Sequence, residues 1–210
     1  MLSEELRKLG IRARKPDRQV GDLLSLAKRQ SKRGNVQKAV SCIRLAAEVM
    51  ESRMGKWMDK FMIYDNLISF FAELGQLDEA LKIADRVKPR SLKCYALAMV
   101  SKGYLKHAEP GKALQIADKV WRPSPKGSLL IDIAEWCMAN GKPAKARKLL
   151  SAAFAIAQKP GMDREDRSEM YVIIAWTYSD FGMPRKALQA AEMIRHKKKK
   201  ELVLKHIGKK

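Results

Sequence analysis

Apolar residues recur at spacings of three and four along most of the chain, which is the pattern of amphipathic helices. One clear stripe precedes Gly75 and contains Ile63, Leu67, Phe70, Phe71 and Leu74. No segment shows the alternation of a half-buried strand. The pattern predicts an all-α chain with helix pairs near 19–33 and 36–53, 57–74 and 77–87, 91–106 and 110–121, 127–139 and 143–158, and 165–181 and 184–195. A short helix is expected near 3–9, with Ser3 as its N-cap and Gly10 beyond its end.

The junctions within these pairs share one sequence phrase. A small residue stands five positions before an alanine in five places: Gly34 and Ala39, Gly75 and Ala80, Ala108 and Ala113, Gly141 and Ala146, Gly182 and Ala187. The alanines are 41, 33, 33 and 41 residues apart. The two shorter gaps are close to the 34-residue period of a helix–turn–helix repeat, and the two longer ones add about eight residues. Glycine ends helices because it accepts positive φ, so each phrase predicts a helix–turn–helix corner.

The phrases resemble the tetratricopeptide-repeat (TPR) family over residues 20–195. With the five alanines at motif position 20, position 8 holds Ala27, Ile68, Ser101, Ala134 and Ala175. Position 11 holds Gln30, Phe71, Tyr104, Cys137 and Tyr178. Gln30 and Ile68 depart from the motif, which has a large residue at position 11 and a small one at position 8. The resemblance implies an αα-solenoid of about five repeats, because one helix pair cannot bury its apolar face alone. Another αα-solenoid or a non-repeating helical bundle is the competing fold.

The resemblance also implies a concave groove lined by the first helix of each pair. Carried over residue by residue, the groove contains Tyr95, Lys102, Lys106 and Trp176. The predicted domain organisation is a basic N-terminal segment at 1–18, a repeat domain at 19–195 and a Lys-rich C-terminal helix or tail at 196–210.

Composition adds a strong charge imbalance. The chain of 210 residues has 43 Lys and Arg against 23 Asp and Glu, a net charge of +20. Residues 1–60 carry a net +8 and residues 191–210 a net +6, whereas residues 61–120 carry only +2. Such a balance predicts polyanionic partners: RNA, DNA, an anionic membrane surface or an acidic protein.

The candidate nucleic-acid contacts are the basic residues of the two ends. They are Arg7, Lys8, Arg12, Arg14, Lys15, Arg18, Lys28, Arg29, Lys32, Arg33, Arg195, Lys197, Lys198, Lys199 and Lys200. Flexible or solubilising termini are the alternative interpretation. Lysine also precedes four of the five position-20 alanines, as Lys38, Lys112, Lys145 and Lys186, which suggests either a ladder of phosphate contacts or ordinary exposed helix starts.

Patterns of catalytic, metal and cofactor sites are missing from the sequence. The histidines, His107, His196 and His206, belong to no zinc-binding motif, and no Cys-x-x-Cys occurs. We therefore expect no enzyme activity, no metal and no cofactor. The three cysteines, Cys42, Cys94 and Cys137, fit buried free thiols in a reducing cytoplasm. The sequence shows neither a secretory signal nor a transmembrane run, and its ten Asn and Gln residues favour a thermophilic source.

The sequence thus predicts a cytoplasmic scaffold that docks on structured RNA or a ribonucleoprotein such as the ribosome. Its basic ends would contact phosphates. The main alternative is a protein–protein adaptor that binds a peptide or helix in its groove. Membrane-surface association and homodimerisation stay open.

Overall fold

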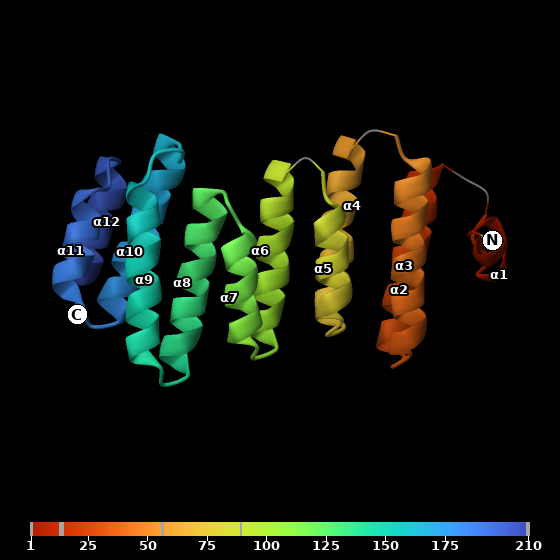
Figure 1. The fold of residues 1–210 in the computed structure, drawn as a ribbon, viewed down its shortest axis with the longest axis horizontal. Coiled ribbons are helices and arrows are strands. Elements are labelled where there is room, and N and C mark those ends of the chain that lie inside the picture. The colour runs from red at the N-terminus through yellow and green to blue at the C-terminus, as the bar shows by residue number, and fades with distance from the viewer. Residues whose placement is uncertain (1, 13–14, 56, 89, 209–210) are drawn as a thin grey trace. The chain divides into compact units, whose positions relative to one another are not determined.

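Helices make up nearly all of the chain (Figure 1). The computed structural model describes residues 2–12, 15–55, 57–88 and 90–208, and these contain no strand. In chain order the helices are α1 (Leu2–Lys8), α2 (Pro16–Lys32), α3 (Val36–Arg53), α4 (Trp57–Glu73), α5 (Leu77–Arg86), α6 (Arg90–Lys106), α7 (Pro110–Lys119), α8 (Pro123–Ala139), α9 (Pro143–Gln158), α10 (Arg164–Asp180), α11 (Pro184–Glu192) and α12 (Lys197–Ile207). The predicted all-α fold is confirmed.

Proline sets several of the helix starts. Five helices, α2, α7, α8, α9 and α11, begin with proline, whose missing N–H would have no partner in the first turn anyway. This explains why α8 begins at Pro123 rather than near residue 127. The predicted N-cap at Ser3 is wrong, because α1 begins at Leu2 and Ser3 lies inside it. The Ser3 Oγ instead accepts a hydrogen bond of 3.0 Å from Arg53 Nη2 on α3.

The five corners share one backbone geometry. The residue at motif position 15 has φ between +59° and +77° in every corner: Gly34, Gly75, Ala108, Gly141 and Gly182. The following residue donates to the carbonyl five residues back, for example Gln76 N to Phe71 O at 2.8 Å and Lys142 N to Cys137 O at 2.8 Å. This bond is the mark of a Schellman motif, which satisfies the last carbonyls of a helix.

Among the described residues, Ala108 is the one non-glycine residue with a positive φ, which is +59°. A Cβ in this left-handed region is strained. We expect Ala108→Gly to raise the free energy of unfolding by about 0.5–1 kcal/mol, measured by urea denaturation. Gly141→Ala is the reciprocal variant and should lower stability by about 1 kcal/mol, since no atom lies within 4 Å of its added Cβ and only the backbone conformation is penalised. Loss of stability in Ala108→Gly would contradict the strain argument.

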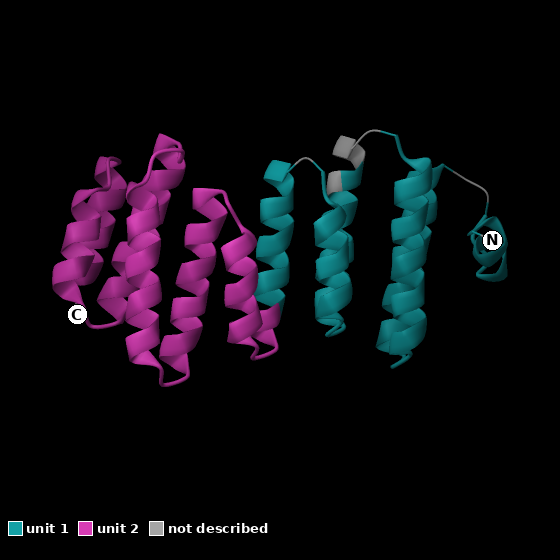
Figure 2. Ribbon diagram, in the orientation of Figure 1, with its two compact units in different colours: residues 1–103 teal, residues 104–210 magenta. Residues whose placement is uncertain are grey.

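The chain divides into two compact units, residues 1–103 and residues 104–210, and the division falls within α6 (Figure 2). In the first unit α1 and α2 contact α3, which contacts α4, and α4 packs against α5. Fully buried side chains here include Leu23, Ile43, Leu67 and Phe71. The predicted boundaries at 18/19 and 195/196 stay a prediction.

In the second unit α7 contacts α8, α8 packs against α9 and α10, and α10 packs against α9, α11 and α12. Helices α8 and α10 approach closely at Gly127, where an added Cβ would lie 2.5 Å from the Met170 Sδ. The last helix, α12, buries Val203 and Ile207. It therefore covers the end of the α10–α11 hairpin.

Burial follows the repeat positions in both units. All five position-20 alanines and all five position-8 residues have no exposed surface. At position 11, Phe71, Tyr104, Cys137 and Tyr178 are at most 2% exposed, whereas Gln30 is half-buried. Within each unit the chain is a stack of TPR-like helix hairpins, as the phrase spacing predicted.

Candidate interaction surfaces

The first basic surface lies on α2 and its C-cap. Lys28, Arg29, Lys32 and Arg33, here called the α2 basic array, are exposed. Among the residues that the structure describes, none of the four forms an ion pair. Their spacing of one, four and five residues places them on one side of the helix. Like charges at these spacings repel one another, so an anionic partner would relieve the repulsion.

The other predicted N-terminal contacts are also exposed, but not all are unpaired. Arg7, Arg12, Lys15 and Arg18 face solvent. Lys8 pairs with Glu4, one turn earlier in α1, at 3.3 Å. Arg14 lies outside the described residues.

Two of the C-terminal lysines make contacts within the chain. Lys199 forms an ion pair with Glu169 of α10. The Lys200 Nζ donates to the Glu192 carbonyl at the end of α11, at 3.5 Å. The same contact over eight residues recurs where Lys93 donates to Asp85 O at 3.0 Å and Arg167 donates to Lys159 O at 3.1 Å. A cation near the last carbonyls of a helix interacts favourably with the helix dipole, as Lys200 does at the end of α11. The ion pair of Lys199 joins α12 to α10. Arg195, Lys197 and Lys198 are exposed.

The lysines that precede the position-20 alanines have contacts of their own. Lys112 Nζ lies 5.2 Å from the ring centroid of Tyr104. Lys186 Nζ lies 5.6 Å from the ring of Tyr178 and 3.3 Å from Ser151 Oγ, on the second helix of the preceding hairpin. These are cation–π and hydrogen-bond contacts of structural origin. They favour the structural interpretation of the lysine row over a phosphate ladder.

Glu79 occupies the same motif position in the second hairpin and also reaches the preceding one. Its carboxylate accepts from Lys82 Nζ at 2.8 Å and from Arg44 Nε of α3 at 3.1 Å. The hydrogen bond from Lys82, then that from Arg44, lowers the pKa of Glu79 below its usual value. In the second and fifth hairpins position 19 thus contacts the hairpin before it.

The lowered pKa of Glu79 predicts a pH dependence of stability. A carboxyl whose pKa is depressed by folding stabilises the folded chain above its unfolded pKa of about 4.3, and this stabilisation is lost as the pH falls through the folded pKa. We expect Glu79→Gln to be less stable than wild type at pH 7 and this difference to be smaller at pH 3, by urea denaturation at both values. Glu73→Gln, at an exposed site on α4, is the control and should show no such convergence. An equal difference at both pH values would contradict the proposed role of the charge.

The predicted groove residues are exposed on their helices. Tyr95, Lys102 and Lys106 are exposed along α6. Trp176 of α10 is 41% exposed, and its ring meets the edge of the His206 ring of α12 at a centroid distance of 6.3 Å. The His206 Nε2 also lies 3.2 Å from Asp180 Oδ1. The C-terminal helix therefore partly covers Trp176. Binding at these four residues stays a prediction.

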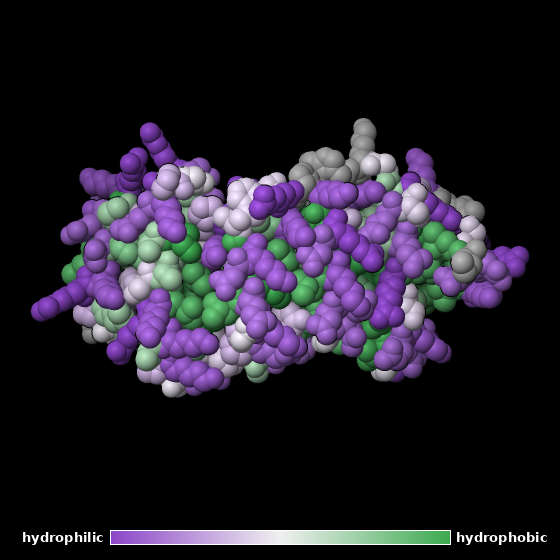
Figure 3. All heavy atoms as spheres, viewed as in Figure 1, coloured by the Kyte–Doolittle hydropathy of each residue, from purple (hydrophilic) through white to green (hydrophobic). Residues whose placement is uncertain are grey.

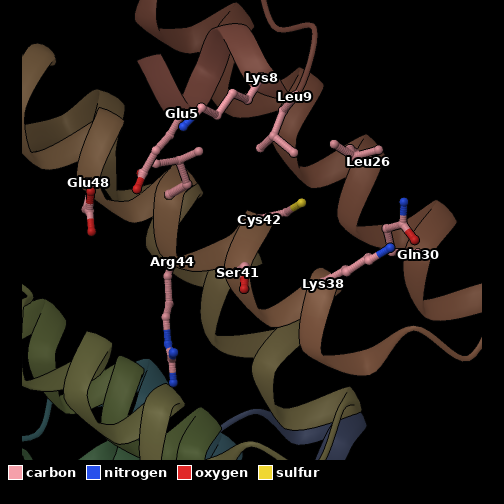
Figure 4. Close-up of a pocket in the computed structure, with 11 residues that line it drawn as sticks. Glu5, Lys8, Leu9, Leu26, Gln30, Lys38, Ser41, Cys42, Arg44 and Glu48 are labelled. Carbon is pink, nitrogen blue, oxygen red and sulfur yellow. The ribbon is translucent and has the colours of Figure 1, made fainter. Parts of the chain in front are cut away.

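A cavity of about 490 Å³ lies in the first unit, between α1, α2 and α3 (Figure 4). Its apolar wall consists of Leu9, Leu26, Leu45 and Cys42. Its polar lining comprises Glu5, Lys8, Gln30, Lys38, Ser41, Arg44 and Glu48. The sequence pattern predicts no site here, although Gln30 departs from the repeat motif. Burial raises the pKa of the Cys42 thiol, so this sulfur is a neutral part of the wall.

Two further observations concern the described residues alone. They contain no cluster of three or more His, Cys, Asp or Glu side chains arranged to hold a metal ion. None of the helices within the described ranges combines the length and apolar character needed to cross a membrane.

On the face shown in Figure 3, hydrophilic side chains project outermost and hydrophobic ones are visible between them.

Comparison with known proteins gives a likeness among solved structures only. No family model matches the chain, and no curated protein matches it. The chain is similar to a crystal structure of a single-substitution variant of a Podosopora anserina putative kinesin light chain with nearly identical TPR-like repeats. That alignment has 20% identity and a TM-score of 0.45, and it covers 88% of this chain and 96% of the other. A second structure of the same protein gives 20% identity, a TM-score of 0.43, and coverage of 86% and 94%.

Proposed function

We propose that this chain is a non-catalytic helical-repeat scaffold that binds a protein partner through an acidic segment of that partner. The observation that carries the proposal is the α2 basic array. Its four exposed cations share one side of a helix and form no ion pair with described residues. Complementary charge sets the association rate and the choice of partner more than it sets raw affinity.

Structured RNA is the second candidate. It is favoured by the exposed cations next to the array and at the other end of the chain: Arg7, Arg12, Lys15, Arg18, Arg195, Lys197 and Lys198. The internal contacts of Lys199 and Lys200 reduce the charge available for phosphates, and for this reason we place the protein partner first. RNA contacts by Lys and Arg would release counterions and would be strongly weakened by salt.

The test is capture of partners from native extract by the full chain, with and without nuclease. The array variant carries Lys28→Glu, Arg29→Glu, Lys32→Glu and Arg33→Glu. The matched control reverses three exposed cations of α9, as Lys145→Glu, Arg147→Glu and Lys148→Glu. We expect a protein partner that survives nuclease, is lost with the array variant and is retained by the α9 variant.

The other outcomes separate the candidates. Capture that disappears with nuclease would favour RNA. In a filter-binding series the logarithm of the affinity should then fall with log salt with a slope of about 0.7–0.9 per phosphate contacted. Equal capture by wild type and the array variant would overturn the proposal that the array selects the partner.

A further inference from the structure

The α1–α2–α3 cavity lies beside position 11 of the first hairpin, which holds no large apolar side chain. In three of the four later hairpins Phe71, Tyr104 and Tyr178 occupy position 11, and each is at most 2% exposed, whereas the fourth hairpin has the smaller, buried Cys137 there. In the first hairpin this position holds Gln30, which lines the cavity instead of filling it. Its Oε1 accepts a hydrogen bond of 2.9 Å from Asn35 Nδ2, which ties the amide to the corner. The large aromatic group that three of the later hairpins supply internally is therefore missing here.

The cavity is elongated along α3. The α3 residues that line it include Lys38, Ser41, Cys42, Leu45 and Glu48, at spacings of three and four along one helix face. Lys38 and Glu48 are ten residues apart, which corresponds to about 15 Å of helix. This length accommodates a large side chain together with a neighbouring residue of the same peptide segment. Its volume of about 490 Å³ is within the range of ordinary ligand sites, roughly 300–1,000 Å³.

The two ends of the cavity differ in their charged residues. Figure 4 shows Lys38 beside Gln30 at one end, Glu5 and Glu48 toward the other, and the Cys42 sulfur between them. Arg44 is turned away, since its guanidinium pairs with Glu79. Within the described residues Lys38 forms no ion pair. A carboxylate of an incoming segment would thus meet Lys38 and Gln30 at one end, next to the apolar wall.

The position of Lys38 in its hairpin supports the same direction of approach. Its counterparts Glu79 and Lys186 contact the preceding hairpin, through Arg44 and Ser151. Lys38 instead faces the cavity beneath α1. Leu9, which follows α1, is 42% exposed at this site and offers hydrocarbon surface for a partner to cover.

We infer that this cavity receives a large apolar side chain from an acidic segment of the protein partner, with an adjacent carboxylate of that segment on Lys38. The inference rests on the proposed function, and it names the part of the first unit that the partner enters. The acidic character of the segment follows from Lys38, from the α2 basic array and from the net charge of +8 over residues 1–60. Anchoring by one buried large side chain is typical of interfaces in which a few residues supply most of the affinity.

The probe is a fluorescein-labelled acidic peptide that carries one Trp among Glu and Asp residues, with binding to the full chain followed by anisotropy. Two comparison peptides replace the Trp with Ala or the acidic residues with Lys. We expect only the acidic Trp peptide to bind. Failure of that peptide to bind wild type, or equal binding of the Ala peptide, would overturn the inference.

Variants of the chain locate the site. Gln30→Phe should fill the cavity as Phe71 does in the next hairpin, weaken peptide binding about tenfold or more, and raise the melting temperature. Gln189→Phe, at an exposed position of α11, is the control and should leave binding unchanged. Lys38→Glu should weaken binding, whereas Lys145→Glu, at the same motif position of the fourth hairpin, should not. Peptide binding unaffected by both Gln30→Phe and Lys38→Glu would refute the site.

Other occupants have distinct signatures. Self-association of wild type in sedimentation that Gln30→Phe abolishes would assign the cavity to a second copy and overturn the inference. Decanoate that displaces the peptide and binds more tightly than it does would assign the cavity to a small amphiphile, with the same consequence.

Partner capture separates this inference from the proposed function. If the array variant no longer captures the partner but Gln30→Phe still does, the inference about the cavity is refuted and the proposed function stands. Capture retained by both variants would refute the proposed function.

Discussion

Truncation of Phe71 to alanine should lower the free energy of unfolding by about 3–5 kcal/mol. Phe71 has no exposed surface and fills position 11 of the second hairpin in the first unit. Its removal loses the transfer free energy of a buried aromatic ring and leaves a void that the closely spaced helices cannot close. Urea denaturation followed by circular dichroism measures the loss.

The neighbouring Phe70 provides the matched control. It is a phenylalanine of the same helix but only half-buried, so Phe70→Ala should cost less than half as much. Equal losses in the two variants would mean that position 11 has no special place in the core. The result also bears on Gln30, because it measures what an aromatic side chain contributes at the position where the first hairpin lacks one.

Replacement of Ala146 with leucine should destabilise the chain by about 1–3 kcal/mol. Ala146 has no exposed surface and stands at position 20, where α9 packs against α8. A longer side chain there would push the two helices apart or take a strained rotamer. The corresponding change at Ala113, Ala113→Leu, should have an effect of similar size.

Ala144→Leu tests whether the penalty comes from overpacking. Ala144 lies on the same helix and is exposed, so its replacement should change stability by no more than about 0.5 kcal/mol. Unchanged melting temperatures in both Ala146→Leu and Ala113→Leu would contradict the close helix contact at position 20.

The hairpin corners could be predicted from sequence because they depend on local chemistry. A small residue at position 15 and a buried alanine at position 20 are set by backbone conformation and by the contact within one hairpin. Both features can be recognised within a segment of six residues. The same phrase located the corner at Ala108, which lacks the glycine of the other corners, and the structure gives this alanine a positive φ. The predicted start of α8 near residue 127 is too late, because Pro123 opens the helix.

The roles of individual cations could not be predicted in this way. Lys199 and Lys198 are neighbours in a run of lysines, yet Lys199 pairs with Glu169 across thirty residues and Lys198 faces solvent. Charge counting does not distinguish them, because the difference depends on which helix face packs against α10. The cavity could not be predicted for a similar reason. Its lining residues Leu9, Leu26 and Cys42 come from three segments, and no local sequence pattern shows that these segments meet.

The contacts made by position 19 also bear on how this chain could change during evolution or engineering. The second hairpin presents Glu79 to Arg44 of the hairpin before it, whereas the fifth presents Lys186 to Ser151. Exchanging these two modules would set a lysine against Arg44 and produce repulsion where there is now attraction. The hairpins share one backbone geometry, but the residue at position 19 and its contact with the preceding hairpin differ between them. Duplication or shuffling of single repeats would therefore lose these contacts unless the adjoining helix changed as well.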